Sequence, residues 1–128
     1  MEDKQKILIV EDERPIAMAY GDFLTSKGYE VEFAYDGKEG LEKLNEFKPD
    51  LVLLDIVMPV MDGISMLKLL RNSDVCCGLE NVKVMILTNL EMVTKMQEAE
   101  VLNCASYLIK AHYSLDEMLK KIKDTLKK

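Results

Sequence analysis

A continuous apolar run that ends in a carboxylate is the feature of this sequence that most restricts its fold. Four consecutive apolar residues, Leu51 to Leu54, lead directly into Asp55. A short uninterrupted run of this kind is typical of a strand buried on both faces, as in a parallel sheet covered by helices. Because an aspartate inside such a strand is costly to desolvate, we expect Asp55 where the strand emerges from the core. Pro59 then indicates a turn.

Further apolar runs along the chain predict strands of the same sheet. The five expected strands are 6–10, 30–35, 51–55, 82–88 and 105–110. Helical patterns separate them, and the expected helices lie at about 15–27, 37–48, from 63 onward, around 92–99 and at 114–126. Alternation at this spacing indicates βαβ units, a parallel sheet and right-handed crossovers. The partly alternating polarity of 30–35 indicates a strand nearer the sheet edge.

Local signals predict where several helices begin. Asp12 or Glu13 is a candidate cap for a helix opened by Pro15, and Asp36 is a candidate cap for the next helix. Ser114 and Glu117 have the spacing of a capping box. The last helix is predicted to be amphipathic, with the apolar positions Leu115, Met118, Leu119, Ile122 and Leu126.

Composition limits the class of protein. A chain of 128 residues with 48% hydrophobic and 31% charged residues suits one soluble domain. No apolar run approaches the roughly 20 residues of a membrane span, and the amino terminus has no apolar signal segment, so we expect a cytoplasmic protein without a membrane partner. The net charge of −6 argues against direct nucleic-acid binding. Three cysteines fit neither a disulfide framework nor a zinc site.

Polar side chains at the ends of the predicted strands form one set. Glu11 and Asp12 follow the first strand, Asp55 ends the third, Thr88 the fourth and Lys110 the fifth. In a parallel sheet these ends share one rim, where ligands bind. Carboxylates brought together repel one another unless a cation joins them, and oxygen ligands suit Mg²⁺. A hydroxyl and an ammonium beside a carboxylate nucleophile suit phosphoryl transfer.

Each member of this set also has an ordinary structural interpretation. Acidic residues after a strand are commonly a solvated loop, and Asp55 alone is equally well a capping or turn aspartate. A lysine at a strand end often serves only solubility. We favour the functional interpretation because the whole set falls at the ends of strands that share one rim.

The motifs around these residues resemble the receiver domain of bacterial response regulators. The resemblance covers the whole chain, from I-L-I-V-E-D-E through L-V-L-L-D-I-V-M-P-V-M-D-G and V-M-I-L-T to Y-L-I-K. It implies a flavodoxin-like, doubly wound α/β fold: a five-stranded parallel sheet in the order 2-1-3-4-5 with five helices. It also implies a single receiver domain over residues 1–128.

The resemblance implies a phosphoacceptor and a magnesium site. Asp55 would accept a phosphoryl group from a histidine kinase or a phosphotransfer protein. Mg²⁺ would be held by Glu11 (directly or through water), Asp12, Asp55 and the backbone carbonyl of Val57. A receiver of this kind is not an enzyme in the usual sense, since it catalyses only its own phosphorylation and dephosphorylation.

The resemblance also implies a switch. Thr88 and Lys110 would contact the phosphoryl group, and Tyr107 would move when Thr88 is drawn inward. The partner surface altered in this way comprises the fourth helix, the fifth strand and the last helix, and it would bind a downstream protein target or effector. A plain buried aromatic remains the alternative for Tyr107. We expect a monomer or a weak phosphorylation-dependent dimer.

Two other functions fit the sequence less well. A hydrolase with an aspartyl nucleophile would typically carry a second acid at position 57, which is a valine, and a nucleotide or flavin binder would need a glycine-rich loop after the first strand. A receiver-like adaptor that is not phosphorylated stays open, since Asn89 and Ala111 depart from the family pattern. A second open alternative is a receiver cut from a longer regulator with an effector domain, although we expect a stand-alone regulator.

The residues two positions beyond Asp55 and Thr88 are Val57 and Leu90, both apolar. Side chains at these positions flank the phosphoryl group in receivers, where polar ones can orient the attacking water. Our hypothesis is that apolar ones make the aspartyl phosphate long-lived.

Overall fold

The computed structural model of the protein describes residues 4–55, 82–88, 106–109 and 114–127, and for residues 55, 87, 88, 106–109 and 127 it describes the backbone alone. The strands are β1 (Lys6–Val10), β2 (Glu30–Ala34), β3 (Leu51–Asp55), β4 (Lys83–Thr88) and β5 (Ser106–Ile109). The described helices are α1 (Arg14–Ser26), α2 (Gly37–Phe47) and α5 (Leu115–Lys127). The two helices expected from 63 onward and around 92–99 lie outside the described residues.

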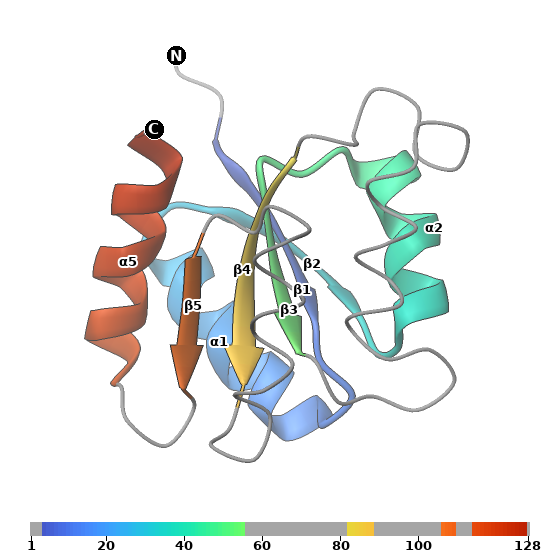
Figure 1. Ribbon diagram of the computed structural model, residues 1–128, viewed down its shortest axis with the longest axis horizontal. Coiled ribbons are helices and arrows are strands. Elements are labelled where there is room, and N and C mark those ends of the chain that lie inside the picture. Colours follow the sequence, from blue (N-terminus) through green and yellow to red (C-terminus); the bar gives the residue numbers. More distant parts are fainter. Residues whose placement is uncertain (1–3, 56–81, 89–105, 110–113, 128) are drawn as a thin grey trace.

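The five strands form one parallel sheet in the order β2-β1-β3-β4-β5. This order confirms the doubly wound, flavodoxin-like arrangement, with β2 at an edge and β3 at the centre (Figure 1). The register pairs Val10 of β1 with Ala34 of β2 and Leu54 of β3, and it pairs Asp55 with Leu87 of β4. The strands therefore end almost level with one another.

Both faces of the central strands are buried, which explains the unbroken apolar run in β3. One face carries a core cluster shared with α1 and α5, made of Ile7, Ile9, Leu51, Leu53, Met85, Ala17, Leu24, Met118 and Ile122 together with Tyr29. Side chains alternate along a strand, so the fully buried Leu8, Val10, Val52 and Leu54 face the other side. The helix α2 packs against β1 and β2 and lies away from α1 and α5 (Figure 1).

The helix α1 begins without the side-chain cap that the sequence suggested. Glu13 occupies the N-cap position with an extended backbone, but its side chain makes no capping hydrogen bond, and Asp12 is not the cap. Glutamate is not among the residues favoured at this position, and Pro15 in the first turn supplies the helical φ instead. The helix ends at Ser26, before Gly28 with its φ of 98°.

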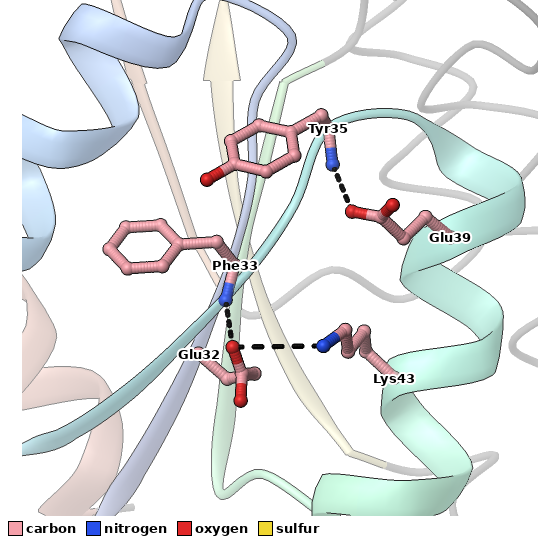
Figure 2. A network of polar contacts seen from close by, with 5 residues as sticks. All are labelled: Glu32, Phe33, Tyr35, Glu39 and Lys43. Atoms are coloured by element: carbon pink, nitrogen blue, oxygen red, sulfur yellow. Dashed lines mark hydrogen bonds and ion pairs between the residues drawn. The ribbon is translucent and has the colours of Figure 1, made fainter.

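The helix α2 begins with the predicted aspartate cap. The backbone N–H of Glu39 donates to Asp36 Oδ1 over 2.8 Å. The Glu39 carboxylate accepts from the N–H of Tyr35 over 2.9 Å, as Figure 2 shows. Each of these two acidic side chains therefore satisfies a backbone donor at the junction between β2 and α2. Together the two bonds tie the first turn of α2 to the end of β2.

The capping box predicted for α5 is half formed. Ser114 Oγ accepts from the N–H of Glu117 over 3.2 Å, whereas the Glu117 carboxylate lies 3.5 Å from Ser114 Oγ instead of bonding to a backbone N–H. The apolar stripe is confirmed at Met118 and Ile122, which are fully buried. Leu115 is a correction, because it is 37% exposed. It lies in the first turn, one turn before the first residue that reaches the core.

Candidate functional site

The strand ends at one rim of the sheet bring together several of the predicted site residues. In Figure 1 the arrowheads of β4 and β5 point to this rim, and α1 begins near it. The register makes Asp55 level with Leu87, and it pairs Thr88 with Ile109. The strands β1, β3 and β4 are neighbours, and adjacent strands lie about 4.8 Å apart. The rim therefore carries Glu11, Asp55 and Thr88 in this order.

Glu11 and Asp12 lie directly after β1 and differ in their exposure. The N–H of Glu11 donates to the carbonyl oxygen of Ala34 over 3.0 Å, which continues the pairing of β1 with β2 by one residue. Glu11 is fully buried and has an interaction partner, while Asp12 is half-buried. A buried carboxylate is costly unless it is paired, so Glu11 next to Asp12 is an arrangement suited to a cation.

Asp55 and Thr88 are the last residues of β3 and β4. Their strands are adjacent and parallel, so both residues reach the rim that carries Glu11. Tyr107 lies inside β5 opposite Ile86, two positions before the last pair of that ladder, Thr88 with Ile109. The structure describes the backbone of Asp55, Thr88 and Tyr107. Their strands have the order that the resemblance implied.

Val57 and Lys110 lie outside the described residues. Lys110 follows Ile109, the last residue of β5, directly in the sequence. The predicted contributions of Lys110 to phosphoryl binding and of the Val57 carbonyl to metal binding stay predictions.

The donor chemistry at the rim fits Mg²⁺. Glu11 and Asp12 supply carboxylate oxygens, which are the ligands that this ion prefers, and Asp55 is the neighbouring strand end. Among the side chains that the structure describes, no three of His, Cys, Asp and Glu gather closely enough to hold a metal. This search does not include the carboxylate of Asp55, because only the backbone of that residue is described. Asp55 is the residue at this rim that would supply a third oxygen donor.

One feature of this rim was missed by the sequence analysis. The guanidinium carbon of Arg14, the first residue of α1, lies 3.9 Å from the centroid of the Tyr35 ring, just past the end of β2. From the sequence, Tyr35 was placed at the end of the second strand and Arg14 was assigned no role. Arg14 lies three residues after Glu11, and Tyr35 directly precedes Asp36. These positions carry no signal that the two side chains would touch, because the contact depends on the pairing of β1 with β2.

The sequence matches one known protein family over most of its length. A family model for the response regulator receiver domain matches residues 7–123. The chain is 34% identical over 124 residues to sporulation initiation phosphotransferase F of Bacillus subtilis, covering 97% of this chain and 92% of that protein. It is 37% identical over 108 residues to chemotaxis protein CheY of Treponema pallidum, covering 82% of this chain and 72% of that protein.

Another relative is a longer protein. Transcriptional regulatory protein DltR of Streptococcus agalactiae is 36% identical over 118 residues, which are 92% of this chain and 50% of DltR. The chain therefore spans about half the length of this curated relative.

Solved structures show the same fold. The Francisella response regulator 1452 receiver domain superposes with a TM-score of 0.83 at 30% identity, over 97% of this chain and 98% of that one. The chemotaxis protein CheY4 of Vibrio cholerae superposes with a TM-score of 0.85 at 28% identity, over 96% and 99%. Within the described residues, no helix of this protein has the length and apolar content needed to cross a membrane.

Proposed function

Because this chain belongs to the response regulator receiver domain family, we propose that it is a phosphorylation switch whose acceptor is Asp55. Receivers are signalling domains of two-component systems, and their partners are histidine kinases or phosphotransfer proteins. The proposal assigns Glu11, Asp12, Asp55 and the Val57 carbonyl to Mg²⁺, and it assigns Thr88 and Lys110 to the phosphoryl group.

The position of Asp55 in the strand order carries this proposal. Its strand, β3, lies between β1, which is followed by two acids, and β4, which ends in a threonine. A carboxylate at that position has metal ligands on one side and a hydroxyl donor on the other. Four consecutive buried residues before it fix the backbone of β3 in the core, so the nucleophile is carried by a rigid element.

In the proposed reaction an Asp55 carboxylate oxygen attacks the phosphorus of the donor. An O–P bond forms as the bond between phosphorus and the donor nitrogen breaks, and the imidazole of the donor histidine leaves and takes up a proton. Thr88 and Lys110 then hold the phosphoryl oxygens through a hydroxyl and an ammonium. When bound, Mg²⁺ neutralises charge on the phosphoryl oxygens and on the carboxylates that would otherwise repel them.

The output of the proposed switch involves β4 and β5. Thr88 and Tyr107 lie on adjacent strands, with Tyr107 two residues before the position that pairs with Thr88. A hydroxyl drawn toward the phosphoryl group would leave space that Tyr107 enters, and the surface formed by β5, α5 and the helix expected around 92–99 would change. We propose that a downstream protein target binds this surface, with the receiver monomeric or weakly dimeric.

The test is the intact mass after incubation with acetyl phosphate, with and without magnesium. We expect a gain of one phosphoryl group in the wild type that requires magnesium, and none in Asp55→Asn. The matched control is Asp22→Asn, which makes the same chemical change at an exposed position of α1. A phosphoryl gain that survives in Asp55→Asn would contradict the assignment of the acceptor.

A second candidate function is a receiver-like adaptor that is not phosphorylated. The departures at Asn89 and Ala111 favour it, because both residues adjoin proposed phosphoryl contacts in the sequence. No mass gain from any phosphodonor, in a sample with native circular dichroism, would support this candidate. The similarity to one half of DltR leaves a further proposal, that this receiver acts together with an effector domain.

A further inference from the structure

Arg14 is the first member of a stack of side chains that joins α1 to β2. Its guanidinium carbon lies 3.9 Å from the centroid of the Tyr35 ring. The Tyr35 ring is parallel to the Phe33 ring within 2°, with 6.4 Å between the centroids. Figure 2 shows both rings on the side of β2 opposite Glu39 and Lys43. An exposed arginine normally keeps its rotamer freedom, so this stack fixes a charge that would otherwise move.

The fixed charge lies at the rim that carries the proposed phosphorylation site. Tyr35 follows β2 directly, and the N–H of Glu11 donates to the preceding carbonyl, that of Ala34. Because β2 and β3 flank β1, the backbones of Tyr35 and Asp55 are two strand spacings apart, about 10 Å. At that distance one charge acts on another in dilute buffer, where the Debye length is about 10 Å at 0.1 M salt.

The guanidinium is able to bind an anion in this position. The guanidinium carbon contacts the Tyr35 ring, and arginine has five N–H donors that can bind an anion. Among the residues that the structure describes, the ion pair found is Lys43 with Glu32, at 3.8 Å, and no described carboxylate pairs with Arg14. The donors of Arg14 are therefore not taken up by an acidic neighbour within this part of the chain.

The surroundings explain why such a charge would matter. The sequence places Glu11, Asp12 and Glu13 immediately before Arg14, and the chain has a net charge of −6. A phosphodonor is itself an anion, so this rim repels it until a positive group compensates. Arg14 is the described cation that α1 presents at this rim, since Lys27 lies at the other end of the helix.

We propose that Arg14, held in place by the ring of Tyr35, is a positioning residue that recognises the phosphoryl group of the incoming donor beside Asp55. The inference rests on the function proposed above. Its ligand is a phosphoryl dianion, and that group is shared by a small acyl phosphate and by a phosphorylated imidazole. Arg14 forms and breaks no covalent bond in this scheme; it lowers the donor concentration at which the acceptor is half-saturated.

The experiment measures the rate of Asp55 phosphorylation against donor concentration, with acetyl phosphate and with monophosphoimidazole, at saturating magnesium. The variants are Arg14→Gln, Tyr35→Leu and Tyr35→Phe. The matched control is Lys27→Gln, which removes the same charge from the same helix at a lysine that also lies over an aromatic ring, 5.4 Å from the Phe23 centroid. Thermal unfolding of each variant verifies that it is folded.

We expect Arg14→Gln to lower the second-order rate constant about fourfold at low ionic strength with both donors, from the attraction of one charge for a dianion at about 10 Å in water. The change should appear in the half-saturating concentration and not in the maximal rate. Tyr35→Leu should act in the same direction, whereas Tyr35→Phe and Lys27→Gln should resemble the wild type. The effect should vanish in about 1 M salt, where the Debye length is about 3 Å.

An Arg14→Gln rate equal to that of Lys27→Gln would overturn the inference and leave Asp55 as the acceptor. A loss confined to one donor would also overturn it, because the recognised group would then be the leaving group. A wild-type protein that takes up no phosphoryl group from either donor would overturn the proposed function first, and this inference with it. An unchanged rate in Tyr35→Leu would contradict the proposal that the Tyr35 ring holds Arg14 in place.

Discussion

The ring of Phe33 occupies the space that a side chain at Gly21 would need. A Cβ built on Gly21 would lie 2.6 Å from Phe33 Cε1, closer than real Cβ contacts come. Gly21 lies in the middle of α1 and is buried, so this glycine permits the close approach of α1 to β2. The contact also supports the lower end of the stack that carries Arg14.

Gly21→Ala should therefore destabilise the protein despite the better helix propensity of alanine. Overpacking costs about 1–3 kcal/mol, while alanine in place of glycine gains about 1 kcal/mol in a helix. We expect the free energy of unfolding, measured by urea denaturation, to fall by about 1 kcal/mol. In a Phe33→Leu background the same change should stabilise the protein. A stabilising effect of Gly21→Ala in the wild type would show that the ring moves away freely.

The cap of α2 provides a second stability prediction. Asp36 Oδ1 accepts from the N–H of Glu39 over 2.8 Å, so Asp36→Ala should lower the free energy of unfolding by about 1 kcal/mol. Asp36→Asn is the matched control, because asparagine caps a helix about as well as aspartate. Chemical denaturation measures both variants, and equal losses would mean that the charge of Asp36 matters more than its hydrogen bond.

Removal of magnesium should affect the wild type and an acidic-site variant differently. Where magnesium exceeds its dissociation constant tenfold, a site present only in the folded state should add about 1.4 kcal/mol of stability. Asp12→Asn should lose most of this gain, and in EDTA it should be more stable than the wild type because it relieves repulsion with Glu11. Thermal unfolding with EDTA and with magnesium measures the effect. Glu13→Gln, at an exposed neighbour, should keep the wild-type response to magnesium.

The lifetime of the phosphorylated state should depend on the residue two positions beyond Asp55. If the apolar side chains of Val57 and Leu90 leave the attacking water unoriented, Val57→Asn should shorten that lifetime several-fold. The decay of the phosphorylated mass after removal of the donor measures it, with Val57→Ile as an apolar control. Rapid decay in the wild type that Val57→Asn leaves unchanged would contradict the hypothesis.

Much of the fold follows from local features of the sequence. Buried runs such as Leu51 to Leu54, the cap at Asp36 and the spacing of Met118 and Ile122 depend on hydrogen bonds and periodicities within a few residues, so they were predicted correctly. At the start of α1, Glu13 occupies the N-cap position, as one of the two expected residues, but its side chain makes no capping hydrogen bond. The exposed Leu115 shows that the spacing of apolar residues predicts which face of a helix is buried, but not at which residue the burial begins.

The sequence by itself determined the alternation of strands and helices, and it determined that Glu11, Asp55 and Thr88 end buried strands. Which of these ends are neighbours was implied only by the resemblance to receivers and is shown by the tertiary structure, because the strand order depends on crossovers between distant segments. The tertiary structure decided that Arg14 lies on Tyr35 and that Phe33 fills the space beside Gly21. These contacts join residues 12 or more positions apart, and they exist only once β2 has paired with β1 and α1 has packed across them.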